Sequence, residues 1–220
     1  MTTPRGPGVP ATEPGALAPF LARVSARLAD LLPQLVRVLA RHWLLLANIV
    51  LTLQALLPYL APALMQLGYL RAGHNLYSLY VPLCHQLPER SFFLFGLQYT
   101  YSLRELESLL GVEVPLRYIG DSIIGYKTTV CQRDVATYMT MWLAGLLFVG
   151  LRNRLRPLSL KIFVTLCIPI AIDGLGQLVG VWTSTPLTRV VSGGLFGLAC
   201  VWLAFPLIEV GMRDVQRLSY

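Results

Sequence analysis

Two short motifs carry the residue types best suited to chemistry. The sequence is Cys-His-Gln at residues 84–86 and Cys-Gln-Arg-Asp at residues 131–134. They place thiols, an imidazole and neighbouring opposite charges in a chain that is otherwise mostly apolar. Ionisable groups near a bilayer are costly unless they are paired or have a function. The two motifs are therefore the first candidates for a functional site.

Three chemistries fit Cys84, His85 and Cys131. A disulfide between the two cysteines would add about 4 kcal/mol in the chain-entropy model. Alternatively, the thiols and His85, with Asp134 nearby, have the ligand types that zinc or another transition metal prefers. The paired spacing of a typical zinc motif is absent, however. In the third interpretation the thiols are inert and packed beside a hydrogen-bonded histidine, and the sequence leaves all three open.

A carboxyl group also falls inside an apolar segment. Asp173 and Gln177 are four residues apart, so they share one face of the expected helix. An ionisable group within a membrane span suggests function, although it can also be structural. Arg133 or Arg90 could form a buried ion pair with Asp173. The candidate functional cluster is Cys84, His85, Arg90, Cys131, Arg133, Asp134, Asp173 and Gln177, with no catalytic role given to any member.

The composition indicates a protein that lives in lipid. Only 13% of the 220 residues are charged and 55% are hydrophobic, whereas a soluble domain has about 25% charged residues. The mean hydropathy is +0.60. A net charge of +7 can indicate nucleic-acid binding, but the basic residues gather at the ends of apolar runs, where topology signals lie. We therefore expect a single membrane domain and no nucleic-acid partner.

Apolar runs long enough to cross a bilayer predict an all-α, polytopic membrane helix bundle with about four transmembrane helices. Pro58 and Pro62 are expected to kink or end the first span, because proline disrupts a helix. This span starts too late to be a cleaved signal peptide, so a retained signal-anchor helix is expected. The expected spans are 43–60, 135–151, 160–181 and 187–208.

The bundle, residues 42–210, is expected to have distinct flanking segments. Residues 1–19 are rich in Pro, Gly, Ala and Thr and predict a disordered tail. Residues 20–41 alternate leucines with arginines at helical spacing, which predicts a basic amphipathic helix on an anionic membrane surface or packed on the bundle. Residues 211–220 are expected to form a cytoplasmic tail.

The distribution of basic residues predicts the orientation in the cell membrane. Arginines and a lysine concentrate before the first span, between the second and third spans, and after the fourth. Residues 71–134 instead carry six basic and six acidic residues. The positive-inside rule therefore places both termini in the cytoplasm and residues 71–134, with both polar motifs, on the outside.

The outward segment is expected to contain short re-entrant or interfacial helices. It is rich in aromatic residues between 74 and 101 and is interrupted by Pro82 and Pro88. Ser102 and Glu105 form a capping-box pattern before an apolar run that stops at Gly111, which predicts a short helix. Residues 116–129 are expected to be irregular.

Paired glycines predict how the last two spans pack. Gly176 and Gly180 in the third span, and Gly193 and Gly197 in the fourth, have the spacing that lets helix backbones approach closely. We expect the third and fourth spans to pack along these faces. The same faces could support a homo-oligomer or a larger membrane complex.

Three longer motifs contain most of these candidate residues: Cys-His-Gln-Leu-Pro-Glu-Arg-Ser-Phe-Phe (84–93), Cys-Gln-Arg-Asp-Val-Ala-Thr-Tyr (131–138) and Pro-Ile-Ala-Ile-Asp-Gly-Leu-Gly-Gln-Leu (169–178). Together they resemble an uncharacterised family of predicted membrane proteins, domain of unknown function 2085. Ser184, Arg189, Gly193 and Phe196-Gly197 resemble a closing motif. The resemblance covers about residues 76–206 and implies a small multi-span membrane protein, without an activity.

Three classes of function stay open at this point. The first is an outer-face enzyme or redox protein with a thiol or metal site, in which Arg90 or Arg133 lowers a thiol pKa. The second is a small-molecule transporter or ligand-binding membrane protein that uses Asp173 and Gln177. The third is a structural accessory subunit of a membrane complex, for which we expect no bound metal and tolerance of Cys84→Ser.

Overall fold

The computed structural model describes residues 17–218. Four of its helices are long and apolar enough to cross a membrane, over Leu31–Gln66, Gln132–Leu151, Leu160–Leu178 and Pro186–Arg217. The predicted all-α membrane bundle is therefore confirmed. Contacts divide the chain into two compact units, one over Trp43–Gly211 and the other made of the described residues up to His42 and from Met212 onward.

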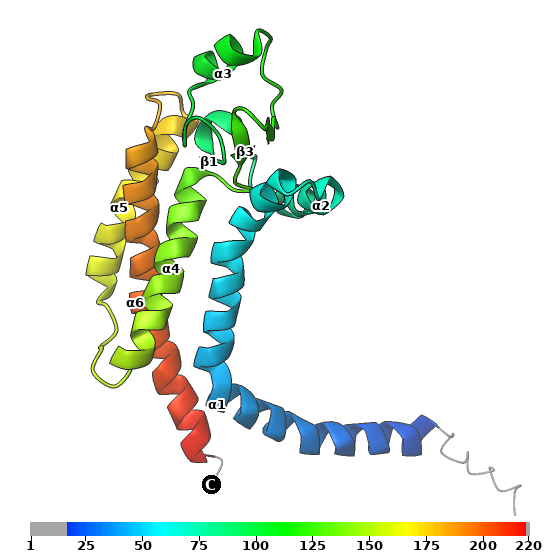
Figure 1. Ribbon diagram of the computed structural model, residues 1–220. Helices are drawn as coiled ribbons and strands as arrows, with labels where there is room; N and C mark the ends of the chain where they lie inside the picture. Colours follow the sequence, from blue (N-terminus) through cyan, green and yellow to red (C-terminus); the bar gives the residue numbers. More distant parts are fainter. Residues whose placement is uncertain (1–16, 219–220) are drawn as a thin grey trace, which may run out of the picture. The chain divides into compact units, whose positions relative to one another are not determined.

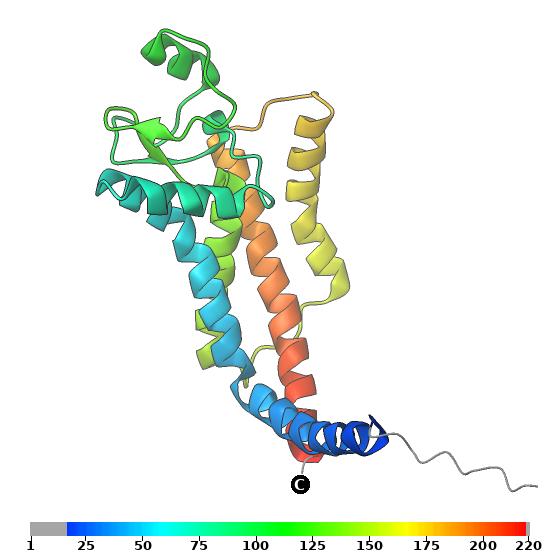
Figure 2. The ribbon, with the colours of Figure 1, turned by 90° about the vertical axis from the view of Figure 1, so that its right-hand side faces the viewer.

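The larger unit contains the bundle. Figure 1 and Figure 2 show three helices side by side with the part of α1 that follows Trp43. The long helices are α1 (Leu17–Gln66), α4 (Gln132–Leu151), α5 (Leu160–Leu178) and α6 (Pro186–Leu218). Aromatic rings join three of them, because Phe205 lies 5.4 Å from Trp43 and 5.6 Å from Phe148 between ring centroids, edge to face.

The bundle surface is apolar. Only 11% of the most apolar window of α5 is buried inside the protein. Leu143 and Leu147 of α4 and Ile172 of α5 are likewise exposed. Such a surface is stable when hydrocarbon covers it, so the protein lies in a lipid bilayer.

The first span does not end at these prolines, because α1 continues through Pro58 and Pro62 to Gln66. Pro62 has no N–H with which to bond the carbonyl of Pro58, four residues earlier. The backbone N–H of Thr129 donates to that carbonyl instead, at 3.3 Å. A segment far along the chain thus satisfies the group that proline leaves free.

The segments that flank the bundle at the two ends of the chain can also be compared with the predictions. The tail expected over residues 1–19 lies mostly outside the described residues, and α1 begins at Leu17. Residues 20–41 are helical, as expected, but as part of α1. The segment expected as a cytoplasmic tail from residue 211 is helical as far as Leu218, because α6 continues into it.

Residues 67–131 form a folded cap at one end of the bundle (Figure 2). The order is α2 (Leu70–Tyr80), a 3-10 turn (Pro88–Arg90), β1 (Phe93–Leu94), α3 (Leu103–Leu110), β2 (Gly120–Asp121) and β3 (Gly125–Lys127). The strands form an antiparallel sheet in the order β1-β3-β2, with Phe93 opposite Lys127 and Asp121 opposite Gly125. The segment expected to be irregular over 116–129 thus contains two of the three strands, which are too short to show an alternating pattern.

The short helix predicted in the cap is confirmed as α3. The Ser102 hydroxyl accepts from the backbone N–H of Glu105, whose carboxylate accepts from the N–H of Ser102 at 2.6 Å. Gly111 ends the helix in the left-handed conformation, at φ 67°.

The predicted pairing of the glycine faces is wrong. A Cβ on Gly193 would lie 2.4 Å from the carbonyl oxygen of Arg133, and one on Gly197 would lie 2.5 Å from that of Thr137. These glycines therefore bring α6 against α4, whereas Gly176 packs against the Trp182 ring. Because the α6 face is used inside the chain, self-association through it stays a prediction.

Candidate functional site

The motif Cys-Gln-Arg-Asp lies at the first turn of α4, and its side chains belong to two separate groups of residues. Cys131 is the N-cap residue of the helix and Asp134 lies three positions later, so both lie on one side. Asp134 places its carboxylate in the first turn of the helix, where an acidic group is favourable. We call Cys84, Cys131 and Asp134 the thiol cluster. We call Gln132, Arg133, Asp173 and Arg189 the guanidinium cluster.

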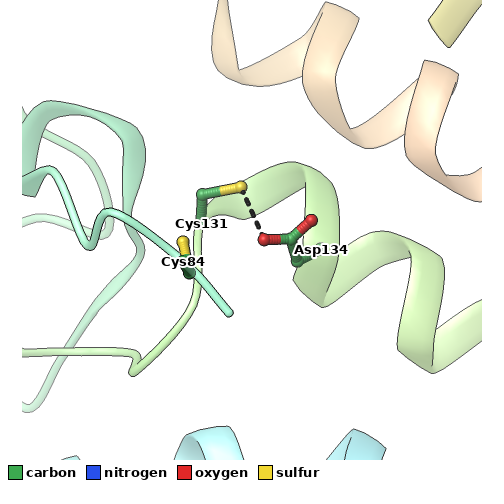
Figure 3. Close-up of side chains that lie close together, drawn as sticks. All are labelled: Cys84, Cys131 and Asp134. Carbon is green, nitrogen blue, oxygen red and sulfur yellow. Dashed lines mark hydrogen bonds between the residues drawn. The ribbon is translucent and has the colours of Figure 1, made fainter. Parts of the chain in front are cut away.

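The thiol cluster joins two distant parts of the chain. The two sulfurs and a carboxylate oxygen of Asp134 all lie within 4.8 Å of one another. Cys131 Sγ donates to Asp134 Oδ2 at 3.2 Å, while Cys84 lies on the neighbouring cap segment (Figure 3). Cys84 and Cys131 are both half-buried and both are free thiols.

The loop that carries Cys84 is held by the cap. The N–H of Cys84 donates to the carbonyl of Tyr80 at the end of α2, at 3.0 Å. Gln86 is buried and has a left-handed backbone, with φ 56°, which is costly for a residue other than glycine. Its side chain donates to the Tyr77 carbonyl at 2.7 Å, and its own carbonyl accepts from the Lys127 ammonium. These bonds fix where Cys84 lies.

The two thiols have different proton affinities. The Cys131 thiol, as a hydrogen-bond donor, lowers the pKa of Cys84 to about 7, although burial acts in the opposite direction. The same contact, together with burial, raises the pKa of Cys131. Near neutral pH, Cys84 therefore carries thiolate character and Cys131 retains its proton. The Cys131 thiol has a single proton, so it can donate a hydrogen bond to Cys84 or to Asp134, but only to one of them at a time.

Lys127 is a residue that the sequence analysis missed. It lies in β3 with its side chain fully buried, and burial lowers its pKa to about 8. The charge of Cys84 acts on that pKa in the opposite direction. A buried ammonium thus lies close enough to interact with the thiol. A lone lysine in a three-residue strand gives almost no signal in the sequence.

The guanidinium cluster contains the predicted ion pair. Arg133 Nη2 pairs with Asp173 Oδ2, which confirms Arg133 as the partner of the carboxylate. Arg90, the other expected partner, lies beside Glu89 at 3.7 Å. The Ser184 hydroxyl also donates to the Asp173 carbonyl at 3.5 Å.

Arg189 joins the same cluster from α6. Its Nη1 donates to Gln132 Oε1 at 3.1 Å and to the Glu89 carbonyl at 3.3 Å. Gln132 in turn donates to the Ser91 carbonyl at 3.0 Å. The sequence placed Arg189 only in the closing motif of the family resemblance, without a role.

Besides Arg90, two candidate residues lie outside both clusters. His85 is exposed and does not belong to the group of three ligand-type atoms. Gln177 is half-buried, and its Nε2 has no hydrogen-bond partner among the described residues. The predicted convergence is therefore seen as two clusters that share the first turn of α4.

Comparisons with known proteins agree with a membrane protein of unknown function. Residues 121–203 match the family described as "Predicted membrane protein (DUF2085)". The chain resembles this family. The match includes Cys131 and Asp173, while the Cys84 motif lies outside the matched residues.

A curated relative is equally uncharacterised. An uncharacterised protein of Methanocaldococcus jannaschii is 27% identical over 135 residues, which is 60% of this chain and 67% of the relative. No solved structure matches the chain. The comparisons therefore bring no activity with them, and the argument for function depends on the two clusters.

Proposed function

We propose that this integral membrane protein carries a redox-active dithiol, Cys84 and Cys131, that exchanges with a protein disulfide outside the cytoplasm. The proximity of the two sulfurs and the Asp134 carboxylate, all within 4.8 Å, carries the proposal. The cysteines come from separate segments, so the cap must fold to bring them together. The placement of the cap outside, with cytoplasmic termini, belongs to this proposal and rests on the basic residues at the opposite ends of the spans.

The different pKa values of the thiols give each a part in the exchange. Cys84, with its pKa lowered to about 7, supplies the thiolate that attacks one sulfur of the partner disulfide. The other partner sulfur leaves as a thiolate. Cys131 then loses its proton to Asp134, 3.2 Å away, and attacks Cys84 Sγ. A Cys84–Cys131 disulfide forms and the partner leaves as a dithiol, so two electrons pass to the partner.

A second candidate function is metal binding, because three ligand-type atoms converge. Two thiolates and a carboxylate suit zinc or another transition metal, and a fourth position would be left for water or a substrate. His85, next to Cys84 in the chain, remains a proposed ligand for that position.

Thiol and metal counting on the same purified protein distinguishes the two functions. The redox proposal predicts that two thiols disappear on mild oxidation with oxidised glutathione and return on reduction, with no bound metal. Cys84→Ser and Cys131→Ser should each abolish the reversible loss. Cys167→Ser, in α5, is the matched control and should keep it.

Stoichiometric zinc that is lost in both Cys84→Ser and Cys131→Ser would instead support the metal site. Four thiols that resist oxidation in a metal-free protein would contradict both functions. A membrane-impermeant maleimide, applied to intact cells, tests the side: labelling of Cys84 from outside is expected, and labelling only after lysis would contradict the orientation.

A further inference from the structure

A polar hollow of about 770 Å³ lies between the cap and the start of α6. Thr183, Ser184, Pro186 and Arg189 line it from α6 and the loop before it. Glu89 and side chains between Gln98 and Glu105 line it from the cap. This hollow does not include the sulfurs, so it is separate from the thiol cluster.

Arg189 is a buried charge that forms no ion pair with the acidic residues of the described chain. The residue is only 4% exposed, and its guanidinium bonds to two neutral acceptors, the Gln132 side chain and the Glu89 carbonyl. Its Nε is buried and has no partner within the described chain. A buried charge is costly unless an opposite charge accompanies it. Arg189 thus has both charge and a free donor to offer a ligand.

Each acidic side chain that lines the hollow has an interaction partner of its own. The Glu89 carboxylate lies 3.7 Å from Arg90 Nε. The Glu105 carboxylate accepts the backbone N–H of Ser102 in the capping box. In addition, α6 begins at Pro186, so the positive end of a 33-residue helix points to the hollow.

We propose that this hollow binds a phosphate group, with Arg189 as its principal partner. A guanidinium holds phosphate through parallel N–H bonds, and the start of α6 adds favourable potential. Phosphate chemistry is shared by a phospholipid headgroup and by free inorganic phosphate. The proposal does not depend on the redox function, since neither cysteine takes part.

Titration of the purified full-length protein in phosphate-free detergent tests the hollow. One arm adds inorganic phosphate, and the other adds short-chain phosphatidylglycerol, with a phosphate-free glycolipid as control. Binding to the folded state raises the unfolding midpoint in proportion to the logarithm of ligand concentration above Kd. At least one phosphate-bearing probe should do so, and the glycolipid should not.

Single substitutions test whether phosphate binds at Arg189. Arg189→Gln should weaken binding by roughly tenfold or more, because it removes a charge-assisted bond, and Arg189→Lys should restore part of it. Arg71→Gln, at an exposed position of α2, is the matched control and should bind as the wild type does. If Arg189→Gln does not fold, Arg104→Gln, an exposed residue of the lining, should still weaken binding several-fold.

The two arms identify the source of the phosphate. A response to inorganic phosphate indicates a free anion, and a response to phosphatidylglycerol alone indicates a lipid headgroup. A wild-type protein that responds to neither probe overturns the proposal. Equal binding by Arg189→Gln and Arg71→Gln would do so as well.

Discussion

The two sides of the first turn of α4 differ in chemistry and in what holds them. On one side, Cys131 and Asp134 face a cap loop and carry groups that can lose protons. On the other side, Arg133 faces Asp173 in α5, so that pair joins one spanning helix to another. One four-residue motif therefore serves two tasks. The guanidinium side links two spanning helices, and the thiol side depends on the cap for its geometry.

The largest difference between the two sides is expected when the Arg133–Asp173 ion pair is removed. Asp173→Asn leaves the half-buried Arg133 without its partner, and we expect the free energy of unfolding to fall by about 3 kcal/mol. The measurement is the unfolding midpoint in detergent. Thiol oxidation, measured on the protein that stays folded, should be unchanged, since Cys84 and Cys131 do not contact this pair.

A double variant shows whether the loss comes from the orphaned charge. Arg133→Met with Asp173→Leu removes both charges, and its stability should lie within about 1 kcal/mol of the wild type. If the double variant is as unstable as Asp173→Asn, the pair contributes more than charge neutralisation.

The next largest effect is expected where α6 approaches the guanidinium side. Gly197→Ala would place a Cβ 2.5 Å from the Thr137 carbonyl oxygen, so α6 must move away from α4. We expect a loss of about 1–3 kcal/mol in the same unfolding measurement. Gly150→Ala is the matched control, because nothing lies within 4 Å of its added Cβ. Equal stability of the two variants would contradict the close packing.

The thiol side should differ from the guanidinium side in the pH dependence of its reactivity rather than in its effect on stability. In a protein with Cys167 and Cys200 replaced by serine, alkylation by iodoacetamide should report Cys84. With a pKa of about 7, its rate should rise roughly tenfold from pH 6 to 8 and then level off. Falling pH protonates the thiolate and slows the reaction. A rate that continues to climb beyond pH 9 would indicate an ordinary thiol.

The sequence predicts the Arg133–Asp173 pair better than the cap that positions Cys84, for physical reasons. The spans have apolar runs long enough to recognise, and a carboxyl group inside one of them requires a partner, so the Arg133–Asp173 pair could be expected. The capping box of α3 is equally local. The strands of the cap have two or three residues, too few to show a period, and Lys127 becomes informative only when β3 is formed. Likewise, α1 continues past Pro62 because Thr129, far along the chain, bonds the free carbonyl of Pro58.

The smallest expected effect tests whether the cap tunes the thiol as well as placing it. Lys127→Met removes a buried ammonium that interacts with Cys84, so the thiolate loses a favourable charge and its pKa should rise by about one unit or less. The alkylation profile should shift to higher pH with its plateau unchanged. Lys161→Met, an exposed residue at the start of α5, is the control and should leave the profile in place. A lower plateau without a shift would mean that Lys127 only positions the loop through Gln86, and that hydrogen bonds, chiefly from Cys131, lower the pKa of Cys84 without help from the ammonium.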